Sequence, residues 1–326
     1  MFNRLALGLI ILSFVSPADA ESAEGPDDAA RIQLAAANAP GDLLSDAYLV
    51  EMLDLTLQQD SQRDHLDPAL REELTATRDR LRQRVETGLA DEPALLATLG
   101  NCFGRYKEES NCPERMDRLA EAGHDNGYYH FVLLSEAARN NDAAGFSRHA
   151  QSMVDAEVFR PVFLEVFSSL YQRYRQVPAS LWSQHMAPYG PEASPGISAM
   201  AQAAAVALPN YQTLYRFCES SADQTREDCV VVARKLTNES TVLLEQFIGA
   251  GLLEKVGDAS DQALAKELKR EGKWLQKSLA AMEDEMDDGQ IGEYFDIFAR
   301  DGEFAAMRFA SKTMGRPVEP PADWQP

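Results

Sequence analysis

Four cysteines are the residues of this chain whose spacing most directly suggests a chemistry. Cys102 and Cys112 have nine residues between them, and Cys218 and Cys229 have ten. Zinc sites usually set paired cysteines roughly two to four residues apart, and redox-active pairs usually read Cys-x-x-Cys, so neither chemistry fits. An even number of cysteines in an exported chain favours disulfides. Of the three possible connectivities, we predict Cys102–Cys112 and Cys218–Cys229.

Each predicted bridge spans a polar segment, "FGRYKEESN" in the first and "ESSADQTRED" in the second. In a helical chain such a bridge would clip the corner between two consecutive helices. Closing a ring of about a dozen residues stabilises a fold by roughly 2.5 to 3 kcal/mol. We expect both segments to be constrained surface loops, and therefore places where recognition could occur.

Metal ligation has little support in the sequence. No His-Glu-x-x-His motif is present. His124, Asp125 and His130 crowd together, but their spacing places them on different sides of a turn and a helix. We therefore predict no metal and no other cofactor.

The acidic stretch 284–295, "DEMDDGQIGEYF", partly matches the calcium-binding EF-hand loop. Counted from Asp284, Asp288 and Gly289 fall at positions 5 and 6, as the template requires. Met286 stands at position 3 and Phe295 at position 12, where a bidentate Glu is needed. Weak calcium binding stays open, and an acidic turn between two helices is the alternative.

Signatures of nucleophilic catalysis and of nucleotide binding are absent from the chain, which contains no Gly-x-Ser-x-Gly, no P-loop and no Gly-x-Gly-x-x-Gly. Paired-carboxylate hydrolysis leaves no such signature, because it needs only two acids about 5 to 10 Å apart in space. The chain has 52 acidic residues, so its sequence singles out no such pair.

The first twenty residues predict export. Arg4 is followed by the apolar run "LALGLIILSFV" and then by "ADA", a small-x-small cleavage site before Glu21. The apolar run is too short for a membrane span. Residue 21 is not a cysteine, so no lipid acceptor follows the signal. We expect a periplasmic or secreted protein that does not insert into the membrane after cleavage.

Composition excludes two kinds of partner. The 326-residue chain carries 31 Lys and Arg against 52 Asp and Glu, a net charge of −21. Nucleic acids and anionic lipids attract clustered positive charge, so we discount both. A hydrophobic content of 45% is ordinary for a globular protein and excludes a disordered acidic tail.

The elements that must position these residues are helices. Ala, Leu, Glu, Gln, Arg and Met are prominent, and no alternating strand pattern persists. Aromatic and aliphatic residues recur at steps of three and four along 158–174, which predicts a core helix. We expect an all-α fold, either a solenoid-like array of helical hairpins or an irregular bundle, with disulfide-clipped corners. The expected regions are a signal peptide (1–20), a loose leader (21–42), two helical regions (43–187 and 197–314) and a proline-rich tail (315–326) that is not helical.

One stretch of the first helical region, "GYYHFVLLSEAARNNDAAGFSRHA", resembles a degenerate tetratricopeptide or Sel1-like hairpin. It has an aromatic opening, an Ala-containing first helix, an Asn-Asp turn and an amphipathic second helix. The resemblance covers one unit of about 35 residues. The whole arrangement also looks like exported bacterial all-helical proteins, a group that implies no particular activity.

Serial amphipathic helices without catalytic signatures favour a non-enzymatic protein that presents a groove or face to a protein or peptide partner. The alternative is an all-α envelope hydrolase that acts on a glycan with paired carboxylates. That alternative predicts a cleft with two facing acids, one of them partly buried with a raised pKa.

Overall fold

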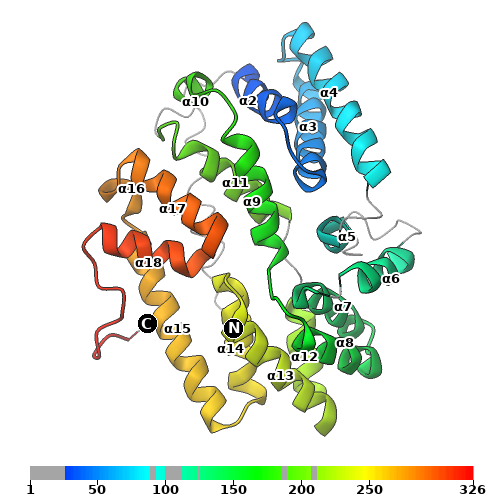
Figure 1. Ribbon diagram of the computed structural model, residues 1–326, viewed down its shortest axis with the longest axis vertical. Coiled ribbons are helices and arrows are strands. Elements are labelled where there is room, and N and C mark those ends of the chain that lie inside the picture. The colour runs from blue at the N-terminus through cyan, green and yellow to red at the C-terminus, as the bar shows by residue number, and fades with distance from the viewer. Residues whose placement is uncertain are drawn as a thin grey trace. The chain divides into compact units, whose positions relative to one another are not determined.

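The computed structural model describes residues 26–88, 93–99, 112–123, 125–185, 189–206 and 211–325. These residues form helices joined by short connections, and none of them forms a strand (Figure 1). The predicted all-α fold is therefore confirmed. Within this described part, no helix is both long enough and apolar enough to cross a membrane. The predicted signal peptide (1–20) and Cys102 lie outside the described residues.

The chain divides into two compact units, each assembled from three separate stretches of sequence. Unit 1 takes in residues up to 95, then 166–206 and 287–295, and unit 2 takes in the remainder. The break at 189–196, where the sequence places a boundary between helical regions, lies inside unit 1. Two helices, α9 (Val162–Tyr174) and α17 (Asp288–Asp301), contribute residues to both units.

Unit 1 is built around a helical hairpin. Helices α3 and α4 pack along each other, and α2 packs against both. The first helix of the hairpin begins at an N-cap, where the Asp42 carboxylate accepts a hydrogen bond from the Ser45 N–H at 2.8 Å. The other two helices of the unit, α10 and α11, come after α9 in the chain. The bounds are α2 Pro26–Asn38, α3 Leu43–Arg63, α4 Pro68–Gly88, α10 Ala179–His185 and α11 Ser194–Val206.

Unit 2 is a series of helices that pack mainly against their sequence neighbours. The pairs α7–α8, α13–α14 and α14–α15 pack closely, and α13 also packs against α8. The bounds are α5 Pro93–Leu99 (which starts in unit 1), α6 Cys112–Ala122, α7 Gly127–Arg139, α8 Ala143–Asp155, α12 Tyr211–Ser220, α13 Asp223–Glu239, α14 Leu243–Val256, α15 Ala259–Leu279, α16 Met282–Glu285 and α18 Glu303–Thr313.

The hairpin α7–α8 coincides with the stretch that resembles a tetratricopeptide unit. It turns at Asn140–Asp142, where Asn141 has a positive φ of 57° and the Asp142 carboxylate caps α8. The periodic aromatic stripe of α9 is buried, with Phe167 and Leu170 fully inaccessible to solvent. The part of the predicted stripe within α9 is therefore core rather than a ligand groove, whereas Val158 precedes the helix and is 51% exposed.

Candidate functional site

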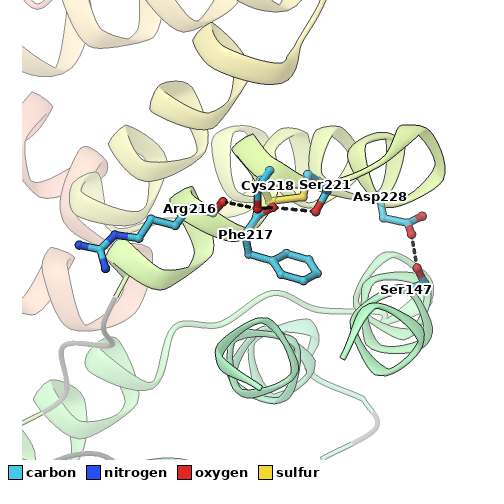
Figure 2. Close-up of a disulfide and its surroundings, with 8 residues drawn as sticks. Ser147, Arg216, Phe217, Cys218, Ser221 and Asp228 are labelled. Carbon is cyan, nitrogen blue, oxygen red and sulfur yellow. Dashed lines mark hydrogen bonds between the residues drawn. A yellow bond between two sulfur atoms is a disulfide. The ribbon is translucent and has the colours of Figure 1, made fainter. Parts of the chain in front are cut away.

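The second predicted disulfide is present in the structure. Cys218 of α12 and Cys229 of α13 are bonded, with their Cα atoms 5.8 Å apart and both side chains fully buried (Figure 2). The bond joins two consecutive helices, as the sequence predicts. The predicted pairing Cys102–Cys112 stays a prediction, because Cys102 and the Cys112 side chain lie outside the description.

The segment between these cysteines is not the surface loop that its composition suggests. Only Ser221 and Ala222 connect the two helices, because α12 continues to Ser220 and α13 begins at Asp223. The Ser221 hydroxyl donates to the Phe217 carbonyl at 2.7 Å, which ties the connection to the end of α12. Because the two helices extend almost to each other, the loop expectation is wrong, and only these two connecting residues remain between them.

Residues at this corner also contact the neighbouring helix α8. The Ser147 hydroxyl of α8 donates to the Asp228 carboxylate of α13. The Phe217 ring lies 4.7 Å, between centroids, from the Phe146 ring of α8. The clipped corner is therefore a packing element of unit 2.

Of the residues that crowd together at 124–130, the structure describes Asp125 and His130 and does not describe His124. Among the described residues, no group of three or more His, Cys, Asp or Glu side chains could hold a metal ion. His130 instead faces His149 across the α7–α8 hairpin, with ring centroids 6.0 Å apart. Burial, together with the Arg148 and His130 charges, lowers the pKa of His149 to about 4, so this imidazole is neutral in ordinary buffers.

The EF-hand-like stretch 284–295 takes in the end of α16, the two connecting residues 286–287 and the first part of α17. Asp288, which the template places at position 5, uses its carboxylate within unit 1. It accepts hydrogen bonds from the N–H groups of Glu192 at 3.2 Å and Ala193 at 2.8 Å. The Asp287 carboxylate accepts from the Gln290 N–H at 2.9 Å. These two carboxylates serve as caps, which matches the alternative of an acidic turn.

Two acids in unit 2, the buried Glu245 and the partly exposed Glu303, were not singled out by the sequence. Glu245 of α14 is 2% exposed and accepts a 2.6 Å hydrogen bond from the Ser240 hydroxyl. Glu303 of α18 accepts from the Leu243 N–H at 2.7 Å, and so caps the first turn of α14. Burial raises the pKa of Glu245 to about 8, and the nearby Glu303 charge adds to this increase. Burial also raises the pKa of Glu303 to about 7.

A buried ion pair holds unit 1 together. The Arg173 guanidinium of α9 pairs with the Asp46 carboxylate of α3, and both side chains are buried. Its remaining N–H groups donate to the carbonyls of Ala36 at 2.9 Å and Ala37 at 3.0 Å, near the end of α2. The Ala36 carbonyl also accepts from the Ala39 N–H at 3.2 Å. The Arg173 side chain thus contacts the end of α2 as well as α3 and ties three helices together.

A surface hollow in unit 1 lies where α4 ends beside the start of α3. It is lined by Leu43, Arg80, Gln83, Arg84, Thr87 and Gly88. No carboxylate lines this hollow. Arg80 donates to the Asn38 side chain at 2.9 Å, and Arg84 lies 3.1 Å from the Asp46 carboxylate. The hollow therefore lacks the two facing acids that a glycan hydrolase requires.

The proline-rich segment 315–325 lies against α15. Helix α18 ends in a Schellman motif, with Gly315 at φ 66° and the Arg316 N–H donating to the Ser311 carbonyl at 2.8 Å. The chain then continues without helix or strand, as the sequence predicts. The Trp274 indole N–H donates to the Pro317 carbonyl at 2.8 Å, and the Arg270 guanidinium donates to the Pro321 carbonyl at 3.0 Å.

Further contacts fix both ends of this segment. The Arg316 guanidinium donates to the Ser278 carbonyl at 2.6 Å and pairs with Glu285 at 2.6 Å. At the other end, the Trp324 ring packs edge-on against the Trp274 ring, with centroids 5.5 Å apart. We call the two donor side chains Arg270 and Trp274 the α15 surface.

Between these ends, Val318 packs against a buried cluster of three residues, Leu243, Leu275 and Met307. A Trp near the end of a proline-rich stretch was the only signal in the sequence for this docking. Comparison with known proteins adds no identification, since no family model, curated protein or solved structure matches the chain significantly.

Proposed function

We propose that this protein is an exported helical protein that binds a peptide segment of a partner on its α15 surface. One observation carries the proposal: a non-helical segment of the chain itself is held there through its backbone carbonyls. Carbonyl oxygens are common to every residue, so a segment from another protein can make the same contacts. Recognition by side-chain donors plus an aromatic platform is a recurring mode of binding extended peptides.

Export is part of this proposal. The N-terminal sequence has the charge, apolar run and cleavage site of a signal peptide. The Cys218–Cys229 bond agrees with an oxidising compartment. N-terminal sequencing of the protein from the envelope fraction should give Glu21 as the first residue, and a retained Met1 would contradict export.

The partner-binding role is tested by affinity capture from the envelope fraction under mild crosslinking. The bait is the full chain, compared with the variants Trp274→Ala and Lys266→Ala. Lys266 is an exposed residue of the same helix and serves as the matched control. We expect a partner that is retained by the control and lost with Trp274→Ala. Circular dichroism confirms that both variants fold. A capture profile that Trp274→Ala leaves unchanged would remove the α15 surface from this role.

Glycan hydrolysis is the second candidate, and the raised pKa values of Glu245 and Glu303 favour it. A protonated carboxyl near pH 7 is what a general acid needs. Purified peptidoglycan is the substrate to test, with the wild type compared with Glu245→Gln and Glu303→Gln. Release of soluble fragments by the wild type and not by the variants would support hydrolysis. Equal release by all three would exclude this pair.

A further inference from the structure

The α15 surface and the segment that it holds are complementary in hydrogen-bonding type. The Trp274 indole and the Arg270 guanidinium can only donate hydrogen bonds. The segment carries prolines at 317, 320 and 321, and proline has a carbonyl but no N–H. Both side-chain contacts from the α15 surface end on proline carbonyls. A surface of donors thus faces a stretch of chain that is rich in acceptors and poor in donors.

The residues of the segment also alternate between partly buried and exposed positions. Arg316, Val318 and Pro320 are partly buried, whereas Pro317 and Glu319 between them are exposed. A turn follows, in which the Trp324 N–H donates to the Pro321 carbonyl at 3.0 Å. This turn brings the Trp324 ring onto Trp274. A ligand that binds in the same way therefore needs side chains facing the surface at alternate positions, followed by a turn at a proline and then an aromatic residue.

The contacts that hold the segment are individually weak. The Arg316–Glu285 pair is solvent-accessible, at 29% and 43% exposure, and solvent screens such pairs. The contact between the Trp324 and Trp274 rings is a single aromatic pair, which corresponds to a factor of about two to ten in affinity. The segment stays in place because it is tethered to α18, which gives it a high effective concentration. A competing ligand with the same chemistry could therefore displace it.

We propose that the α15 surface recognises an extended proline-rich segment of a partner protein that carries an aromatic residue after its prolines, and that residues 316–324 of this chain occupy the surface until the partner displaces them. This proposal rests on the proposed function and gives its ligand class and its regulation. Proline-rich ligands suit such a site because they are already extended and lose little entropy on binding. A partner must therefore bind the α15 surface more strongly than residues 316–324 of this chain do in order to displace them.

The probe is the synthetic peptide GRPVEPPADWQP, which copies residues 315–326. Its affinity is measured by isothermal titration calorimetry for the full-length wild type and for Trp324→Ala. Releasing the internal segment raises the fraction of open sites, and apparent affinity rises with that fraction. From the worth of one aromatic pair, we expect Trp324→Ala to bind the peptide about two- to tenfold more tightly than the wild type does. Equal affinities would overturn the regulation by the internal segment.

Ligand class is tested with two altered peptides on the Trp324→Ala protein. One replaces the prolines at 317, 320 and 321 with alanine, and the other replaces only the tryptophan. We expect both to bind more weakly than the parent peptide. An alanine peptide that binds as well as the parent would overturn the preference for proline.

The contribution of the α15 surface itself is tested by adding Trp274→Phe to the Trp324→Ala protein. It keeps an aromatic ring and removes the N–H donor to Pro317, so peptide affinity should fall. Lys266→Ala in this background is the matched control and should leave peptide affinity unchanged. A Trp274-dependent partner that this peptide does not displace would leave the proposed function standing and overturn the ligand class assigned here.

Discussion

At the scale of single residues, this protein is distinguished by polar side chains that are buried and satisfied. Arg173 and Glu245 lie in helices that are otherwise apolar on their buried faces. Their sequence context, "SSLYQRYRQ" and "LLEQFIG", gives no hint of a partner. The ion-pair partner of Arg173, Asp46, lies 127 residues away in the chain, whereas the hydrogen-bond donor to Glu245, Ser240, lies five residues before it. Neither the burial of these two side chains nor their partners could be predicted from the sequence alone.

Replacing Arg173 with methionine should strongly destabilise unit 1. The change removes the buried ion-pair partner of the Asp46 carboxylate, leaving only the half-exposed Arg84 at 3.1 Å, and it removes the donors to Ala36 and Ala37. Breaking one side of a buried pair costs about 3 to 5 kcal/mol. Urea unfolding followed by circular dichroism measures this loss.

The control for that change is Arg175→Met, two residues further on. Arg175 is exposed and lies over the Tyr171 ring at 5.5 Å. An exposed cation–π contact contributes about 0.5 to 1 kcal/mol, so the effect should be much smaller. Losses of similar size from the two variants would contradict the role assigned to the Arg173–Asp46 pair.

Glu245→Gln should change how stability depends on pH. The pKa of Glu245 is raised from 4.5 to about 8, so the folded state holds a proton that the unfolded state releases. The unfolded state then binds fewer protons between these values, and stability falls as pH rises through this window. Glutamine stays neutral and removes this loss. Near pH 9 the variant should be more stable than the wild type by on the order of a few kcal/mol.

Urea titrations at intervals from pH 5 to pH 9 measure this dependence. The Glu303 carboxyl, with a pKa near 7, should still give the variant a slope at the lower end of the range. The control is Glu227→Gln on the exposed face of α13, which changes the net charge by the same amount but at an exposed carboxylate. If the wild type and Glu245→Gln lose stability in parallel up to pH 9, Glu245 is not protonated in the folded protein.

At the scale of elements, the helices themselves were largely predictable. The Pro68 start of α4 is visible in the sequence because Asp67 precedes it and caps the Ala69 N–H at 2.9 Å. The Cys218–Cys229 clip was predictable from spacing and export together. The surface loop expected between these cysteines was wrong, because acidic and polar residues extend the two helices almost to each other. Composition alone does not distinguish a polar helix end from a polar loop.

Removing the clip should destabilise unit 2 without dismantling it. The bond closes a sequence separation of 11 residues, for which loop-closure entropy predicts a loss of roughly 2.5 to 3 kcal/mol. The double variant Cys218→Ala/Cys229→Ala tests this by urea unfolding under non-reducing conditions. Ser221→Ala, in the connection at the same corner, is the control and should cost about 1 kcal/mol for its lost hydrogen bond. A double variant as stable as the wild type would show that packing of Phe217 alone holds the corner.

At the scale of the whole molecule, each unit draws on distant parts of the chain. Unit 1 is completed by residues 287–295, where Asp288 caps the 192–193 backbone and the Phe295 ring lies 6.1 Å from that of Phe167. The proline-rich break near 189–196 marks a local change of composition and falls inside this unit. Local composition does not encode which distant stretch completes a core, so this interleaving was beyond the reach of the sequence.

Cutting the chain between the two predicted helical regions should therefore disable unit 1. A fragment of residues 21–206 lacks Asp288 and Phe295, so we expect it to unfold without a cooperative transition. Adding the fragment 207–326 should restore cooperative thermal unfolding, followed by circular dichroism. A fragment 21–206 that unfolds cooperatively by itself would show that the later stretch is dispensable.

The three tryptophans of this chain give each unit its own optical reporter. Trp182 in unit 1 is 1% exposed and lies beside the Tyr174 ring, so its emission should be blue-shifted and shielded from iodide. Trp274 and Trp324 in unit 2 are partly exposed, so iodide should quench them. Displacement of the proline-rich segment would thus change only the quenchable part of the fluorescence, and unfolding of unit 1 would change only the shielded part.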